Sequence, residues 1–221
     1  NDNDEAVVAW VQEYGDDNDF AILSSQYLES VWYHPASIDD RIDSAVIQYF
    51  TDSTTYKIVK VANSNKGDAA IIWGKIVEAK DDDYLSRLFI SEKRSGEWLH
   101  PSSAEDSFTP IFDLESNQII FDEQGNFDII LSKDINLDMD NYGNTIIIWK
   151  QDGGLHLPTR LYTSKYEESI WTHPTDIEDF EFGIGGSPRF DMNDNQKGIA
   201  VTEYGKIEYD EGIWNIPTEF S

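Results

Sequence analysis

Residues 166–174 read Tyr-Glu-Glu-Ser-Ile-Trp-Thr-His-Pro, and residues 27–35 read Tyr-Leu-Glu-Ser-Val-Trp-Tyr-His-Pro. A third copy, Trp98-Leu-His-Pro101, and a reduced fourth copy, Trp214-Asn-Ile-Pro217, continue the series. Repetition at long intervals indicates that one supersecondary unit is used several times in a fold. The sequence therefore predicts a repeat architecture, and the fold depends on what one unit forms.

A second landmark precedes these motifs in the form of short runs of Val, Ile and Ala that end in tryptophan. These runs end at Trp10, Trp73 and Trp149. A fourth form, Ile199–Glu203, lacks the tryptophan. The segment Trp10–Pro35 aligns without a gap with Trp149–Pro174, which favours internal duplication. All seven tryptophans fall on two positions of the repeat, so we expect them to be packing residues.

Each unit predicts four strands. The short Val- and Ile-rich runs between polar turns are typical of strands buried on both faces. The segments that follow them alternate apolar and polar residues, which predicts half-exposed strands at Phe20–Tyr27, Leu85–Ser91 and Thr159–Tyr166. The Trp-x-His-Pro segment suits an outer edge strand, because proline cannot donate to a ladder. An inner strand before the buried run is predicted at Ile135–Met139 and Pro188–Met192.

Four antiparallel strands of this kind make one propeller blade, so we predict an all-β fold, a β-propeller of four-stranded antiparallel blades. We expect one domain over residues 1–221, with clear repeats at about 1–44, 58–107, 135–182 and 187–217, and degenerate segments at 45–57 and 108–134. Roughly nineteen strands and about 44 residues per blade favour five blades. Four or six blades remain open.

The first repeat begins at its polar turn, Asn1–Asp4, whereas the later repeats have an inner strand before that turn. We therefore expect three strands in the first blade. An unpaired strand edge invites pairing with another strand. We expect the gap to be filled by an upstream segment or by a partner chain.

The net charge of the chain disfavours two classes of binding partner. It carries 43 acidic and 16 basic residues, a formal net charge of -27. Such a field repels nucleic acid and anionic membrane surfaces, so we expect neither as a partner. The sequence contains no cysteine and no apolar run long enough to insert in a membrane, and we expect no signal peptide within it. The absence of cysteine fits a reducing interior or a bacterial exterior.

The pattern Asp138-x-Asp140-x-x-Gly143-Asn144, a β-branched run ending at Trp149 and the later Trp171-x-x-Pro174 resemble the repeats of bacterial secreted and surface β-propellers. These proteins are distantly similar to sialidase-like propellers. The resemblance implies binding or scaffolding and a location outside the cell or on its surface. The Asp-box of sialidases is absent, so no catalytic residue follows from the resemblance.

Three histidines, His34, His100 and His173, stand two residues after a tryptophan, so each shares a face of its strand with that tryptophan. Related blades would present these imidazoles around the ring as ligand-binding groups. A single imidazole per blade cannot form a polydentate metal site. The alternative is a structural hydrogen bond from each histidine to the acidic pair downstream or to a neighbouring blade.

Oxygen side chains at alternate positions of three turns resemble the spacing of calcium loops. The candidate calcium ligands are Asp113, Glu115, Asn117, Asp138, Asp140, Asp191, Asn193 and Asn195. Asp and Asn also favour such turns without an ion, so calcium binding and plain turn formation stay open.

The sequence thus predicts a binding module for a protein or glycan ligand. The alternatives are a carbohydrate-binding lectin, suggested by the many aromatic residues, and a glycoside hydrolase of the sialidase or arabinanase type. The chain has no cysteine nucleophile, Gly-x-Ser-x-Gly motif or phosphate loop. No pair of carboxylates stands out among the 43 acidic residues, so the pattern favours binding over catalysis.

Overall fold

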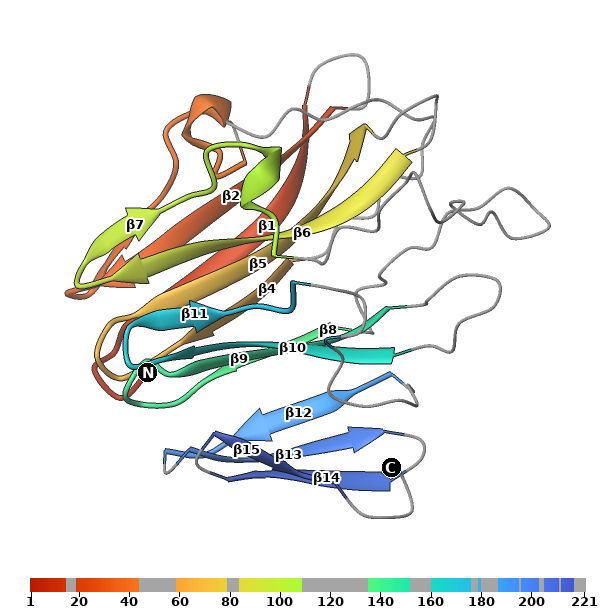
Figure 1. The fold of residues 1–221 in the computed structure, drawn as a ribbon. Helices are drawn as coiled ribbons and strands as arrows, with labels where there is room; N and C mark the ends of the chain where they lie inside the picture. The colour runs from red at the N-terminus through yellow and green to blue at the C-terminus, as the bar shows by residue number, and fades with distance from the viewer. Residues whose placement is uncertain are drawn as a thin grey trace.

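A computed structural model describes residues 1–14, 19–43, 59–78, 84–108, 135–151, 160–175, 179, 187–194, 196–202, 205–210 and 212–216. Within them the chain forms fifteen strands, arranged as four antiparallel sheets, and two short 3-10 turns (Figure 1). The all-β class predicted from the sequence is confirmed. No helix in these residues has the length and apolar character needed to cross a lipid bilayer.

Each sheet follows the chain order of its strands. The first sheet contains β1 (Ala6–Tyr14), β2 (Asp19–Leu28) and β3 (Val31–Tyr33). The second contains β4 (Val59–Asn63), β5 (Ala69–Glu78), β6 (Tyr84–Arg94) and β7 (Glu97–Leu99). The third contains β8 (Ile135–Met139), β9 (Thr145–Gln151), β10 (Arg160–Glu167) and β11 (Ile170–Thr172). The fourth contains β12 (Arg189–Met192), β13 (Lys197–Thr202), β14 (Gly205–Asp210) and β15 (Ile213–Asn215).

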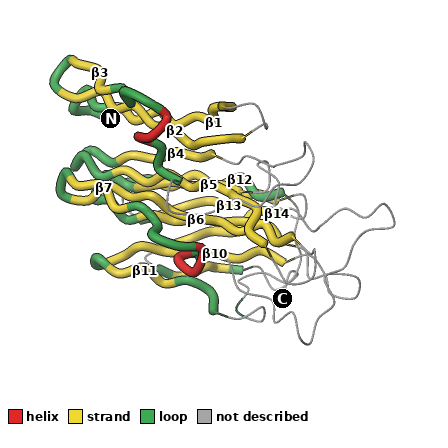
Figure 2. Tube along the Cα trace, turned by 90° about the horizontal axis from the view of Figure 1, so that it is seen from above, coloured by secondary structure: helices red, strands yellow, loops and turns green. Residues whose placement is uncertain are grey.

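The second, third and fourth sheets have the strand order predicted for propeller blades, with an inner strand, a Val- and Ile-rich strand, a third strand and a short outer strand. Successive sheets meet near their inner strands, since β4 contacts both β1 and β8, and β8 contacts β12 (Figure 1). No comparable contact joins β12 to β1 among the described strands, so these four sheets form an arc. A view from above shows the short outer strands β3, β7 and β11 on one side of this arc (Figure 2). The fifth predicted blade falls on segments 45–57 and 109–134, which lie outside the described residues.

The first sheet has three strands in the described residues, as expected from the missing inner strand. Its edge strand β1 corresponds to the second strand of each later sheet, because Trp10 occupies the place of Trp73 and Trp149. The filling of this gap by an upstream segment or a partner chain stays a prediction.

The third and outer strands are joined by two-residue turns whose central residues both have positive φ. These residues are Glu29 and Ser30 in the first sheet, Ser95 and Gly96 in the second, and Glu168 and Ser169 in the third. Positive φ at both positions is the geometry that matches the twist of a tight hairpin. The repeated Glu-Ser pair of the sequence is therefore a turn that works without glycine.

The acidic pair after each His-Pro motif is a local cap. The second acid of the pair accepts a hydrogen bond from the amide directly after the proline, at 2.7 Å from Ala36 to Asp40 and at 2.7 Å from Ser102 to Asp106. Thr175 and Asp179 make the same bond at 2.8 Å. In the first two repeats this carboxylate ends a 3-10 turn, Ile38–Asp40 or Ala104–Asp106.

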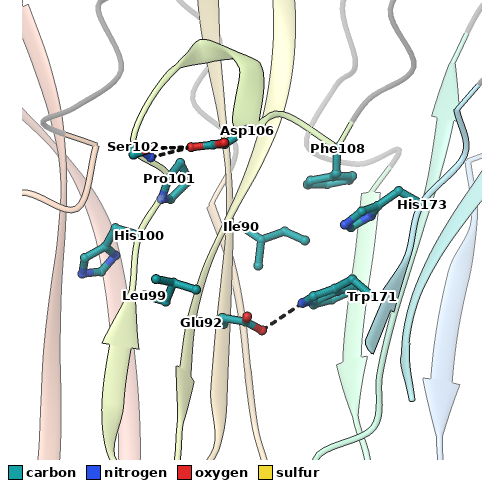
Figure 3. Close-up of a pocket in the computed structure, with 10 residues that line it drawn as sticks. All are labelled: Ile90, Glu92, Leu99, His100, Pro101, Ser102, Asp106, Phe108, Trp171 and His173. Carbon is teal, nitrogen blue, oxygen red and sulfur yellow. Dashed lines mark hydrogen bonds between the residues drawn. The ribbon is translucent and has the colours of Figure 1, made fainter. Parts of the chain in front are cut away.

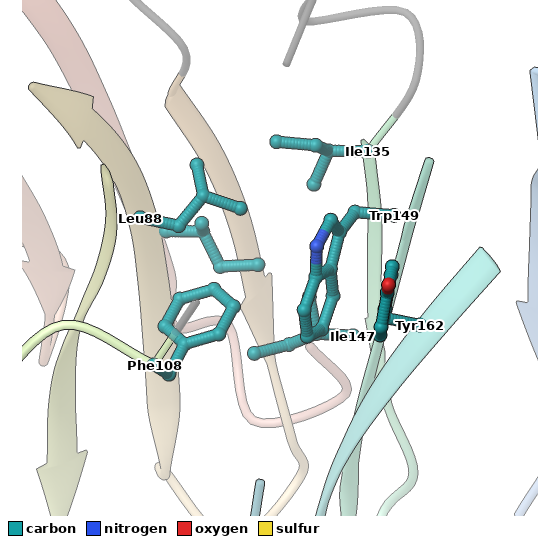
Figure 4. Close-up of a cluster of buried hydrophobic side chains, with 7 residues drawn as sticks. Leu88, Phe108, Ile135, Ile147, Trp149 and Tyr162 are labelled. Carbon is teal, nitrogen blue, oxygen red and sulfur yellow. The ribbon is translucent and has the colours of Figure 1, made fainter. Parts of the chain in front are cut away.

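The core consists of hydrophobic clusters between neighbouring sheets. Trp149 lies at the centre of the cluster between the second and third sheets and is completely buried, as predicted (Figure 4). Its ring meets Phe108 edge-on at 5.2 Å and stacks on Tyr162 at 5.7 Å. Phe108 comes from the second sheet's side, so these aromatic contacts hold two sheets together.

Three expectations about burial are wrong. The Val- and Ile-rich runs of the first and fourth repeats are not buried on both faces, since Val8 and Val201 are each 47% exposed on a face that no other described sheet covers. The predicted half-exposed strand of the third repeat is buried on both faces from Arg160 to Ser164, because a sheet packs on each side of it. Trp32 leaves 43% of its surface exposed, although a packing role was expected for every tryptophan. Trp32 lies on the first sheet, whose corresponding face has no neighbouring sheet among the described residues.

Candidate functional site

A groove of about 330 Å³ lies between the outer part of the second sheet and the outer strand of the third sheet (Figure 3). We call it the inter-sheet groove. The residues that line it are Ile90, Glu92, Leu99, His100, Pro101, Ser102, Asp106, Phe108, Trp171 and His173. Two of the three histidines singled out by the repeat therefore meet at one site.

The second sheet supplies His100 at the rim of the groove. Its imidazole stacks on Trp98, two residues earlier on the same face, with ring centroids 5.7 Å apart. His100 makes no hydrogen bond to the residues that the structure describes. Ser91 holds the repeat position of Ser25 and Ser164, and its hydroxyl accepts a hydrogen bond from the Trp73 indole at 3.0 Å. The polar atoms of His100 are thus free to meet a ligand.

The opposite wall is a column of aromatic rings. His173 stacks between Trp171, at 5.3 Å, and Phe108, at 5.7 Å. Its Nδ1 shares a hydrogen bond of 2.9 Å with the Ser164 hydroxyl on the adjacent strand β10. In Figure 3 the rings lie one above another, with their edges toward Ile90. The ring faces are therefore used for packing within the column, and the groove meets mainly ring edges.

Glu92 lies at one end of the groove and joins the two sheets. One of its carboxylate oxygens accepts a hydrogen bond from the Trp171 indole at 2.9 Å (Figure 3). The same oxygen accepts a hydrogen bond from Arg94 at 3.1 Å. Arg94 also donates to the Gly143 carbonyl at 2.9 Å and lies over the Tyr166 ring at 3.8 Å. This charged cluster fixes the spacing of the sheets at the groove, because planar Arg contacts are geometrically specific.

Asp106 closes the other end of the groove. Its Oδ2 accepts hydrogen bonds from the Ser102 amide at 2.7 Å, the Ser102 hydroxyl at 2.8 Å and the Ser103 amide at 3.1 Å. These bonds stabilise the charged form, and the bonds from Ser102 are the main reason that the pKa of Asp106 is lowered. Asp106 is therefore an ionised acceptor at neutral pH.

Both imidazoles of the groove are neutral at neutral pH. Burial lowers the pKa of His100, because a partly dehydrated site disfavours the charged ring. Burial also lowers the pKa of His173, against a smaller opposing effect of the Glu92 charge. A neutral imidazole has one donor and one acceptor nitrogen. The groove thus combines both nitrogens of His100 and the Nε2 of His173 with two carboxylates, since the His173 Nδ1 is bonded to Ser164.

The third histidine lies away from this groove. His34 is exposed on the first sheet, where its Nδ1 shares a hydrogen bond of 2.9 Å with the Ser25 hydroxyl and its ring stacks on Trp32 at 5.9 Å. In both His34 and His173, the hydrogen-bond partner is a serine on the adjacent strand. The alternative expectation of a bond to the downstream acidic pair is wrong, since that carboxylate caps its own turn.

The oxygen-rich turn at Asp138–Asn144 directs its side chains to its own backbone. The buried Asp140 carboxylate accepts from the Tyr142 amide at 2.8 Å, from the Asn144 amide at 2.9 Å and from the Asn144 side chain at 2.7 Å. These are the bonds of a turn that an aspartate stabilises by itself. The corresponding residue Asn193 accepts from the Lys197 amide at 3.2 Å.

Asp138 forms a bridge between the third and fourth sheets. Its carboxylate accepts from the Met139 amide at 2.9 Å and from the Met192 amide at 2.6 Å. Burial raises the pKa of Asp138, and the nearby charge of Asp191 adds to the rise. Of the other candidate calcium ligands, Asp113, Glu115, Asn117 and Asn195 lie outside the described residues. No group of three or more His, Asp or Glu side chains able to hold a metal ion occurs in the part that the structure describes.

The sequence did not single out Glu92 or Phe108. Each departs from the first repeat, where Gln26 and Ile42 hold the corresponding positions. An alignment of the repeats that asks where one copy differs would have found both residues. The strand register was needed to see that they face Trp171 and His173 of the next sheet.

Comparison with family models finds no match, and comparison with curated proteins finds none. Among solved structures, the crystal structure of polysaccharide lyase Uly1 is similar, with a TM-score of 0.43 and 9% sequence identity. The similarity covers 97% of this chain and 47% of that chain, so the present chain spans about half the length of that protein.

Proposed function

We propose that the protein is a binding module that holds one uncharged sugar ring of a glycan in the inter-sheet groove. The observation that carries this proposal is the meeting of neutral His100 and His173 with the carboxylates of Glu92 and Asp106 around a space of about 330 Å³. The proposal is a more specific form of the binding role expected from the sequence, and it keeps the expected location outside the cell or on its surface.

The size of the groove favours a small ligand or a single unit of a larger one. Binding sites for drug-sized molecules begin at about 300 Å³. At about -0.3 kcal/mol per non-hydrogen atom, a hexose with about twelve such atoms gains about 4 kcal/mol, which corresponds to a dissociation constant near 1 mM. A glycan would reach useful affinity by presenting several copies of the unit.

The charge of the groove disfavours anionic ligands. Two carboxylates lie in it, and the whole chain has a formal net charge of -27. An acidic sugar would be repelled both by the two carboxylates of the groove and by the net charge of the chain, because like charges in a partly buried site interact strongly. We therefore assign a neutral sugar rather than a uronate, sulfate or sialic acid.

The polar groups suit hydroxyl groups. A hydroxyl donates one hydrogen bond and accepts others, and a neutral imidazole beside a carboxylate supplies both kinds of partner. Ile90 and Leu99 give aliphatic surface for the C–H groups of a sugar. Because the aromatic faces are used within the column, recognition here would depend on hydrogen bonds and ring edges rather than stacking.

The same groups favour binding over glycoside hydrolysis. Hydrolysis of this type needs a carboxylic acid with a raised pKa opposite a second carboxylate. The pKa of Asp106 is lowered by Ser102, and the Glu92 carboxylate is engaged by Trp171 and Arg94. Neither group has the properties of a general acid.

A glycan array followed by isothermal titration calorimetry tests this function. We expect binding to one class of neutral glycans, and a loss of affinity of about threefold to tenfold in His100→Ala, the equivalent of one hydrogen bond of 0.5–1.5 kcal/mol. Ile170→Ala is the control, since Ile170 is an exposed residue of the third sheet that does not line the groove. Absence of any glycan binding, or equal affinity in His100→Ala and wild type, would overturn the proposal.

A further inference from the structure

The second and third sheets of the arc each pack one face against the preceding sheet and the other face against the following sheet. We call the face toward the preceding sheet the leading face and the face toward the following sheet the trailing face. Between the second and third sheets, the leading face presents Ile147, Trp149 and Trp171, and the trailing face presents Ile72 and Leu88. Four of these five side chains are completely buried, and Trp171 packs against the cluster.

The first sheet exposes its leading face. Val8, Trp10 and Trp32 occupy the positions that Ile147, Trp149 and Trp171 hold in the third sheet. Val8 leaves 47% and Trp32 leaves 43% of its surface in solvent. The Trp32 indole makes no hydrogen bond to the described residues, whereas the corresponding Trp171 indole donates to Glu92.

The fourth sheet exposes its trailing face. Ile199 and Val201 are 46% and 47% exposed, and they occupy the positions that buried Ala70 and Ile72 hold in the second sheet. Glu208 pairs with Ile199 across the strands as Glu92 pairs with Ala70, so it is the counterpart of the Trp171 acceptor. Among the described strands, the arc therefore ends in two faces that no neighbouring sheet covers, and they correspond to the two halves of the interface between the second and third sheets.

We propose that the trailing face of the fourth sheet packs against the leading face of the first sheet of a second copy of this chain. In this head-to-tail contact the Trp32 indole donates to the Glu208 carboxylate, as the Trp171 indole donates to Glu92. The two faces are different, so the contact is heterologous, and an open assembly keeps one free leading face at one end and one free trailing face at the other until a ring closes.

The charges on the trailing face are compatible with this packing. Lys206 forms an ion pair of 2.5 Å with Glu208, and Arg94 does the same with Glu92 at 3.1 Å. A carboxylate has about four lone-pair sites, so Glu208 can accept from its own sheet's cation and from an indole at once. Val8, Ile199 and Val201 contribute aliphatic surface whose burial drives association.

Analytical ultracentrifugation of the chain over a range of concentrations tests this contact. We expect the mass to exceed that of one chain and to rise with concentration. Val8→Lys places a charge on the leading face, and Val201→Lys places one on the trailing face. Each substitution should block the contact made by its face, so each variant alone should sediment as a monomer. Ile170→Lys is the control, because Ile170 is exposed on an internal sheet, and it should sediment like the wild type.

An equimolar mixture of Val8→Lys and Val201→Lys gives the decisive result. A head-to-tail contact leaves one intact pair of faces in this mixture, so it should form a dimer although neither variant associates alone. Circular dichroism of each variant checks that it folds, and a misfolded Val8→Lys is replaced by Trp32→Lys. A monomeric wild type, or a mixture that stays monomeric while the wild type associates, would overturn the proposal.

Discussion

The indole nitrogen of Trp171 donates a hydrogen bond of 2.9 Å to the Glu92 carboxylate and so links the third sheet to the second. The corresponding tryptophan of the second sheet, Trp98, has a buried indole nitrogen with no partner in the described residues. The repeats thus share a shape but differ in their polar contacts. This difference marks the boundary between the second and third sheets as the place where the chain departs from simple repetition.

Replacing Glu92 with Gln should lower the free energy of unfolding by about 1.5–3 kcal/mol, the range for a hydrogen bond to a charged group. The amide keeps the shape of the side chain but loses the charge that holds Arg94 and the Trp171 indole. Urea unfolding measures the change. Glu97→Gln, an exposed residue of the neighbouring strand, should change stability by less than about 0.5 kcal/mol. Equal effects of the two substitutions would show that the link contributes nothing.

Replacing Trp149 with Ala should cost about 3–5 kcal/mol, because it leaves a cavity among Phe108, Tyr162 and the aliphatic side chains of the cluster. Trp32→Ala removes the same side chain from an exposed site, and we expect less than half of that cost. Chemical denaturation of both variants gives the comparison. A cost below about 1 kcal/mol for Trp149→Ala would contradict its central place in the core.

Replacing Asp140 with Ala should lower stability by about 1–3 kcal/mol, because it leaves the Tyr142 and Asn144 amides without their acceptor. The loss should be the same in millimolar calcium and in a chelator, since the carboxylate is engaged by its own turn. Thermal melts of both proteins under both conditions measure it. If the loop holds calcium instead, the wild type alone should gain melting temperature with the ion and lose it with the chelator.

The protonation of His173 should make the protein less stable in mild acid. Its folded pKa lies below the ordinary value of 6.5, so its contribution is present above pH 6.5 and is lost as the pH falls through the folded pKa. His173→Gln should therefore lose less stability than the wild type between pH 7 and pH 5. The raised pKa of Asp138 acts in the opposite direction, but it is common to both proteins and cancels in the difference.

His34→Gln is the control for this experiment, because His34 lies exposed on the first sheet. It makes the same substitution at a site outside the groove and so shows what the change of side chain alone does to the profile. A His173→Gln profile that is parallel to the wild type would contradict the effect of burial on the His173 imidazole.

The strand order and the buried position of Trp149 could be predicted, because both follow from periodicity within a single repeat. The exposure of Trp32 could not be predicted in this way. Trp32 and Trp171 hold the same place in their repeats, and only the presence of a neighbouring sheet separates an exposed indole from a packed one.

Only some of the residues of the candidate site could be predicted from the sequence. The spacing of His100 and His173 after their tryptophans predicted related positions, but the groove also depends on Glu92 and Phe108 of the preceding sheet. Contacts between sheets depend on strand register and on the angle between blades, which local patterns do not encode. The hydrogen bond between His173 and Ser164 also depends on strand register, because Ser164 lies on the adjacent strand β10.

The most direct test of ligand binding is nuclear magnetic resonance of the histidine side chains during titration with neutral monosaccharides. Three of the four histidines report at once, because His100 and His173 line the inter-sheet groove while His34 lies on another sheet. We predict that one neutral sugar shifts the imidazole signals of His100 and His173 in a saturable way and leaves His34 unchanged. Unchanged signals at all three, or equal shifts at His34, would contradict a sugar site in the groove.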